Sequence, residues 1–159
     1  MTLDETLLQK LGDWRPVGEG RHSMTESLPE AGWTIHIAAD RTDTIGSILW
    51  EASVERLAPP PADANLRGWA EGIASRAAGL MEPLVVHEID PSRKEALLRS
   101  KAPTVRHGDR YYFEVRLNDC RQAVVRRYRV GPNPGDHREQ VSYPITHDTL
   151  SRFVADLAR

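Results

Sequence analysis

The sequence predicts an α+β fold: a single antiparallel sheet of about six or seven strands, packed with an N-terminal helix, a long central helix and a C-terminal helix. Apolar residues repeat with helical spacing near both ends and in the middle of the chain, and with a period of two between these segments. Short turns join the predicted strands, which favours antiparallel pairing. The 159 residues suit one domain, residues 1–159.

The first predicted helix carries an apolar stripe formed by Leu3, Leu7, Leu8 and Leu11. Gly12 is placed to end this helix, because glycine adopts a left-handed backbone without steric cost. Trp14 follows, and we expect it to anchor the chain where it leaves the helix. Of the four tryptophans, Trp14 is also the one we expect to be exposed, which makes it a candidate for contact with a partner.

Two strands with a polar side are predicted next, over WTIHIAAD (33–40) and SILWEASVERL (47–57). The turn-like composition between them predicts a hairpin, and HSMTESL (22–28) is a weaker candidate strand. The buried side of the pair is expected to carry Trp33, Ile35 and Ile37 with Ile48, Trp50, Ala52 and Val54.

Residues 58–65, APPPADAN, form a proline-rich segment that we interpret as a crossover loop within the domain. Asp63 or Asn65 can cap the helix that follows, for which helical spacing extends from Leu66 to Met81. Gly68 and Gly72 lie four residues apart on it and suggest close packing against the sheet.

The second half of the chain predicts several strands and one helix. Strand candidates are LVVHEID (84–90), KEALLRS (94–100), a hairpin within residues 110–130, and REQVSYPI (138–145). The last helix is predicted after an N-cap at Thr146, with an apolar stripe of Leu150, Phe153, Val154 and Leu157.

The segment RYYFEVRLNDCRQAVVRRYRV (110–130) predicts a hairpin with a two-residue turn at Asp119 and Cys120. In this register one face is nearly all apolar, with Arg126 as the exception: Tyr111, Phe113, Val115 and Leu117 with Gln122, Val124, Arg126, Tyr128 and Val130. The polar face carries Tyr112, Glu114 and Arg116 with Ala123, Val125, Arg127 and Arg129. A slip of one residue in the second strand would exchange its two faces.

Charge is unevenly distributed along a chain whose net charge is −2. Residues 1–92 carry 15 acidic and 7 basic side chains, whereas residues 93–138 carry 5 acidic and 12 basic ones. Either the two regions face each other in the fold, or the arginines form a surface for an anionic partner. The candidate binding residues are Tyr112, Arg116, Arg127, Arg129 and Trp14.

No constellation of catalytic or metal-binding residues is evident. The six histidines are scattered without metal-ligand spacing, and no glycine-rich loop leads into a helix as phosphate binding would require. Cys120 lies beside Asp119, whose charge disfavours a thiolate. We therefore predict no catalytic residue, no metal and no cofactor. An enzyme whose site is assembled from distant residues, such as a histidine with a carboxylate, is the alternative.

The order of elements resembles two known layouts. Residues 30–158 resemble the PsbP-like domains, which include DcrB-type proteins and form an α/β/α sandwich. The opening helix followed by three strands and a helix also resembles the dimeric chaperones of type III secretion. Both resemblances imply a non-catalytic protein-binding domain, and neither supplies a residue motif.

The expected function is thus a non-catalytic, soluble protein-binding, adaptor or chaperone-like module, with a protein partner or a second copy of the chain. The alternative is polyanion or nucleic-acid binding through the basic hairpin, which the acidic net charge disfavours. No small-molecule ligand is predicted. The acidic N-terminus and the lack of a long apolar run predict no membrane association and a cytoplasmic location.

Overall fold

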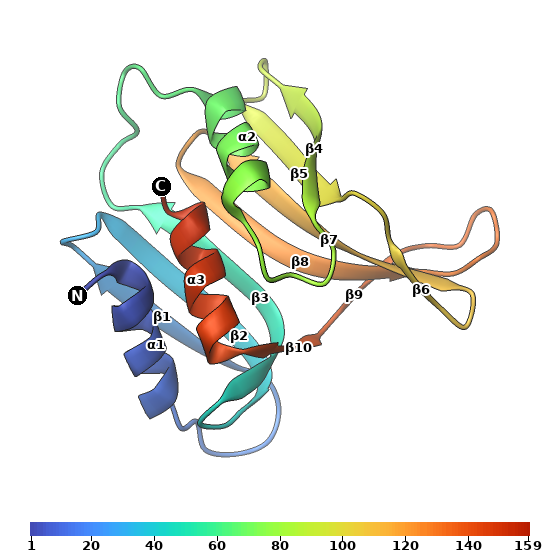
Figure 1. Cartoon of the computed structure of the whole chain (residues 1–159), viewed down its shortest axis with the longest axis horizontal. Helices are drawn as coiled ribbons and strands as arrows, with labels where there is room; N and C mark the ends of the chain where they lie inside the picture. The colour runs from blue at the N-terminus through green and yellow to red at the C-terminus, as the bar shows by residue number, and fades with distance from the viewer.

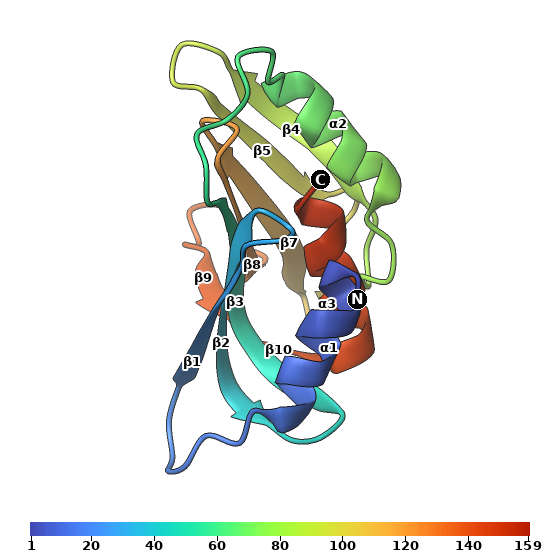
Figure 2. The ribbon, with the colours of Figure 1, turned by 90° about the vertical axis from the view of Figure 1, so that its left-hand side faces the viewer.

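The computed structural model describes all 159 residues and has two layers, an antiparallel sheet and three helices on one side of it (Figures 1 and 2). We call the side of the sheet that the helices cover the helix face, and the opposite side the open face. The α+β class with one antiparallel sheet is confirmed. The ten strands exceed the predicted six or seven.

Seven strands form the main path of the sheet, in the order β1-β2-β3-β8-β7-β5-β4. They are β1 (His22–Leu28), β2 (Trp33–Thr42), β3 (Gly46–Arg56), β4 (Leu84–Asp90), β5 (Glu95–Ser100), β7 (Asp109–Asn118) and β8 (Gln122–Val130). Three short strands pair beside this path: β6 (Thr104–Arg106) with β7, β9 (Glu139–Val141) with β8, and β10 (Tyr143–Thr146) with β3. Strands of three or four residues are too short to show a clear alternation, which explains the lower predicted number.

The three helices are α1 (Leu3–Asp13), α2 (Leu66–Arg76) and α3 (His147–Leu157), each of 11 residues. Their N-caps are Thr2, Asn65 and Thr146, whose side chains accept hydrogen bonds from the first turn. The predicted end of α1 at Gly12 is wrong, because the helix continues to Asp13 and Trp14 is its C-cap.

The prediction of a long central helix is also wrong. α2 ends at Arg76, and the chain then turns at Gly79, whose φ of +91° is left-handed. This turn carries Glu82 to a buried contact with Arg127. The two helix glycines do not meet the sheet either: Gly68 is exposed, and the Arg76 side chain covers Gly72.

The core lies between the helix face and the helices. Leu7 and Leu11 of α1 and Phe153 of α3 are among its fully buried side chains. Trp33 and Trp69 pack with ring centroids 6.1 Å apart, which joins β2 to α2. The open face has no helix over it (Figure 2), so its side chains meet solvent or one another.

A bulge in β3 corrects the predicted faces of that strand. Ala38 pairs with Glu51 and Ala39 pairs with Leu49, so Trp50 is an extra residue. The alternation shifts there by one: Ala52 and Val54 are buried as predicted, but Leu49 replaces Ile48 and Trp50 in the core.

The predicted register of the β7–β8 hairpin is wrong by one residue. Asp119 and Cys120 both have φ of 51°, and pairing begins at Asn118 with Gln122, so three residues connect the strands. The faces of β8 are therefore exchanged. Arg127 lies opposite Phe113 on the helix face, and Arg126 lies opposite Glu114 on the open face.

Candidate functional site

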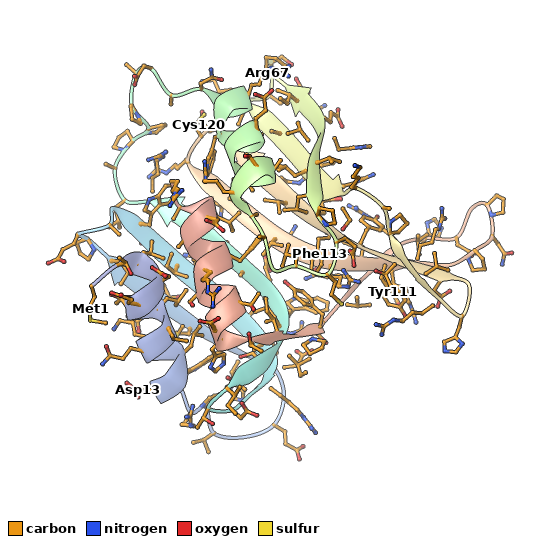
Figure 3. All side chains as sticks on the ribbon, viewed as in Figure 1. Met1, Asp13, Arg67, Tyr111, Phe113 and Cys120 are labelled. Carbon is orange, nitrogen blue, oxygen red and sulfur yellow. The ribbon has the colours of Figure 1, made fainter.

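The hairpin separates the binding residues that the sequence suggested. Tyr112 and Arg116 share the open face, whereas Arg127 and Arg129 lie on the other side of the sheet. Trp14 is half-buried and packs against the core beside α1. In Figure 3, Phe113 lies in the middle of the hairpin, with Cys120 at its turn and Tyr111 toward its other end. Only Tyr112 and Arg116 can contribute to one surface.

Arg127 belongs to a buried ion pair with Glu82. Its Nη1 and Nη2 donate to the two Glu82 carboxylate oxygens at 2.9 and 3.1 Å. The hydroxyls of Ser100 and Thr104 donate to the same carboxylate at 2.8 Å each. Burial raises the pKa of Glu82, but these hydrogen bonds outweigh it and leave that pKa below its ordinary value. Arg127 is only 3% exposed, so it holds the fold together and cannot reach a partner.

A second buried charge, Glu114, lies on the open face and is 4% exposed. Arg138 Nη1 donates to Glu114 Oε2 at 2.5 Å, and Arg99 Nε donates to the same oxygen at 3.3 Å. Arg116 lies 3.7 Å from the other oxygen and is shared with Glu95. Three guanidinium groups thus surround one carboxylate and fix the side chains of this part of the open face.

Several arginines of the basic region meet carboxylates of the acidic half, as one of the two charge hypotheses requires. Arg126 contacts Glu51 at 3.0 Å, and Arg121 lies 3.5 Å from Glu55. Arg129 pairs instead with Glu139 and approaches Asp109, which both lie outside the acidic half. Most of the arginine excess in the hairpin is therefore neutralised within the protein.

The exception is a hollow of about 380 Å³ on the open face, which we call the basic pocket. Its side walls come from β4, the end of β5 and the start of β7, and no Asp or Glu lines it. The lining residues that matter below are Val85, His87, Arg99, Lys101, Arg110 and Tyr112. Lys101 and Arg110 form no ion pair and no side-chain hydrogen bond, so their charges are available.

Strand alternation explains why these residues meet. Residues two apart on a strand point to the same face, which places Arg110 with Tyr112, and Val85 pairs directly with Arg99. His87 is the extra residue of a bulge between Val86 and Glu88, and it lines the pocket beside Arg99. β5 pairs with β7 up to Arg99, and β6 resumes the pairing at Thr104. The segment between them leaves the sheet, held by a hydrogen bond of 2.7 Å from the Lys101 amide to the Pro83 carbonyl.

The Tyr112 ring is held in place beside the pocket. It packs against Tyr128 with ring centroids 5.9 Å apart, and Arg138 donates to its hydroxyl at 3.3 Å. Arg99 lies over the Tyr112 ring at 5.5 Å and contacts His87 at 3.5 Å. The pocket thus combines free cations with a fixed aromatic side chain.

Of these residues only Tyr112 was predicted from the sequence as a binding residue; His87, Arg99, Lys101 and Arg110 were not. The signal was the spacing of two residues between Arg99 and Lys101 and between Arg110 and Tyr112, whereas His87 lies at a bulge and gave no such signal. This spacing could have been used only with the order β4–β5–β7, which the sequence does not show.

His147 is a buried histidine with two hydroxyl groups close to its ring. Its Nε2 lies 2.9 Å from Ser47 Oγ and 3.2 Å from Thr42 Oγ1, beside a hollow of about 660 Å³. Burial lowers its pKa. The distance to Ser47 suits a nucleophile and its base. However, Ser47 is only 5% exposed, and the amides of Ile45 and Gly46 donate to Asp43, so these two amides are not free to stabilise an oxyanion.

Cys120 is the other candidate nucleophile. It lies in the hairpin turn and lines a hollow of about 650 Å³ beside the start of α2. Burial, and then the charge of Asp119, raise the pKa of its thiol. The thiol is therefore protonated at neutral pH.

No group of three or more His, Cys, Asp and Glu side chains is arranged to hold a metal ion. None of the helices combines the length and the apolar character needed to cross a membrane. No family model, curated protein or solved structure matches the chain. The resemblances to PsbP-like domains and to type III secretion chaperones therefore stay predictions.

Proposed function

We propose that this chain is a non-catalytic binding domain that docks an acidic segment of a protein partner on its open face. The observation that carries the proposal is the basic pocket, where Lys101 and Arg110 have no carboxylate partner. Elsewhere on the hairpin the arginines are paired. An anionic side chain of a partner would neutralise these two cations.

The surroundings of the pocket support a docking surface. The charge network of Glu114 fixes Arg99 and Arg138, so little side-chain freedom is lost when a partner binds. Tyr112 belongs to a residue type that is enriched in protein interfaces. The resemblance in element order supports the same class of function by analogy.

An acidic protein segment fits better than nucleic acid. Nucleic-acid binding relies on several unpaired cations that follow a phosphate backbone. Here the two free cations of the pocket, Lys101 and Arg110, line a single hollow of about 380 Å³, and the chain is net acidic. This geometry suits one anionic group rather than a polymer of regularly spaced charges.

The proposal can be tested with fluorescence anisotropy on three short labelled peptides of the same length: acidic, neutral and basic. The protein should bind the acidic peptide, and the double variant Lys101→Ala/Arg110→Ala should lose at least about tenfold in affinity. Arg67→Ala is the matched control, since Arg67 is an exposed cation on the helix side. Equal binding by the variant, or pocket-dependent binding of duplex DNA in place of the peptide, would overturn the proposal.

A further inference from the structure

We infer that the group received by the basic pocket is a phosphate monoester carried on a side chain of the partner segment. This inference rests on the proposed function, because it names the chemistry of the acidic group. Three features of the pocket support it: its charge, its free donors and its apolar walls.

The charge of the pocket matches a dianion. Arg99 shares its charge with Glu114, whereas Lys101 and Arg110 are unpaired. A phosphorylated side chain carries a charge of about −1.5 to −2 at neutral pH. It would neutralise both free cations, while one carboxylate would neutralise only one of them.

The free donors also favour phosphate. Arg110 presents a whole guanidinium group and Lys101 a whole ammonium group, since neither donates to a protein acceptor. Arg99 uses its Nε for Glu114 and its Nη1 for His87, which leaves Nη2 free. A phosphate has three oxygens to accept these bonds, and its geometry matches the planar guanidinium fork.

The walls of the pocket suit the side chain that carries the phosphate. Val85 and the fixed ring of Tyr112 offer apolar surface next to the cations. β4 is the outermost strand of the sheet, so the pocket lies near a sheet edge that a peptide segment can approach. The geometry therefore accommodates an extended segment with one phosphorylated residue.

The test compares short peptides that are identical except for a central Ser, Glu or phosphoserine, with inorganic phosphate as a further probe. Calorimetry should show the phosphoserine peptide binding on the order of tenfold more tightly than the Glu peptide. Lys101→Ala and Arg110→Ala should each reduce this preference, and Arg67→Ala should leave it unchanged. Circular dichroism checks that each variant is folded.

The outcomes separate this inference from the proposed function. Equal affinity for the Glu and phosphoserine peptides, both above the Ser peptide, would overturn the phosphate inference and leave the docking of an acidic segment standing. Binding of inorganic phosphate as tightly as the phosphoserine peptide would overturn peptide docking, because the segment would add nothing. Absence of binding by every probe would overturn both.

Discussion

The two sides of the β7–β8 hairpin each bury one charge, and they balance it differently. On the helix face, Arg127 meets a single carboxylate, Glu82, which also accepts hydrogen bonds from two hydroxyls. On the open face, Glu114 meets three guanidinium groups. Arg127 and Arg126 are neighbours in the chain, yet they lie on opposite faces of the sheet.

This difference indicates that the helix-face pair stabilises the fold, whereas the open-face cluster can take part in binding. The Arg127–Glu82 pair is matched one to one and shielded from solvent, so nothing remains for a ligand to contact. The Glu114 cluster has more cations than carboxylates and adjoins two further free cations in the basic pocket. We therefore expect changes on the helix face to act on folding and changes on the open face to act on binding.

Removing one partner of the Arg127–Glu82 pair should cause the largest loss of stability. Arg127→Met leaves the Glu82 carboxylate buried without its cation, which should cost roughly 3–5 kcal/mol in the free energy of unfolding. Urea denaturation followed by tryptophan fluorescence measures the loss. The double variant Arg127→Met/Glu82→Leu is the control and should recover much of it, because it removes the stranded charge as well. If Arg127→Met were as stable as the parent protein, the expected difference between the two faces would be wrong.

A change at Glu114 should cost less stability and alter binding. In Glu114→Gln the guanidinium groups lose their carboxylate, but Arg99 and Arg138 remain about one-third exposed, so water compensates part of the loss. We expect a decrease of about 1–3 kcal/mol. Arg99 no longer shares its charge with a carboxylate, and this gain should outweigh the lost ordering of its side chain, so affinity for the phosphoserine peptide should rise severalfold in the same calorimetric assay. A loss of stability equal to that of Arg127→Met, with unchanged affinity, would show that both faces are purely structural.

The hairpin illustrates what the sequence could and could not predict. Helices and long strands follow from clear apolar periods, as at Leu150 and Phe153 in α3 or Ile35 and Ile37 in β2. The register of β8 does not, since apolar residues occupy both of its faces. The register of β8 in the structure is associated with the ion pair between Arg127 and Glu82, which lies 45 residues earlier in the chain.

The basic pocket could not be predicted for a related reason. Its residues come from three strands, and pairing of β5 with β7 rather than with β6 places Arg99 near Tyr112. Local patterns report which way a side chain points on its own strand. They do not report which strand lies beside it, because strand order is decided by packing across the whole sheet.

The third prediction concerns pH and the helix side. Burial lowers the pKa of His147 below its ordinary 6.5, although the charge of Asp43 opposes this. The folded state therefore binds the proton more weakly than the unfolded state, so stability should fall as the pH drops below about 6.5. Urea midpoints at about pH 7.5 and about pH 5.5 measure the slope. His147→Gln should flatten it over this range, and an unchanged slope would contradict the assignment.

The smallest expected effect concerns the turn that sets the register. Asp119 and Cys120 both have φ of 51°, a conformation that Asn and Gly adopt more readily. Replacing the pair with Asn-Gly should stabilise the protein by about 0.5–1 kcal/mol and leave peptide binding unchanged. Thermal denaturation measures the shift, and a decrease in stability would argue against the left-handed turn.

The most direct test of the central claim is an NMR titration of the labelled protein with the phosphoserine peptide. We predict that amide shifts concentrate at residues 85–87, 99–101 and 110–112, around the basic pocket, and that α1, α2 and α3 stay unchanged. Shifts concentrated on the helices, or beside Cys120, would contradict the assignment of binding to the open face.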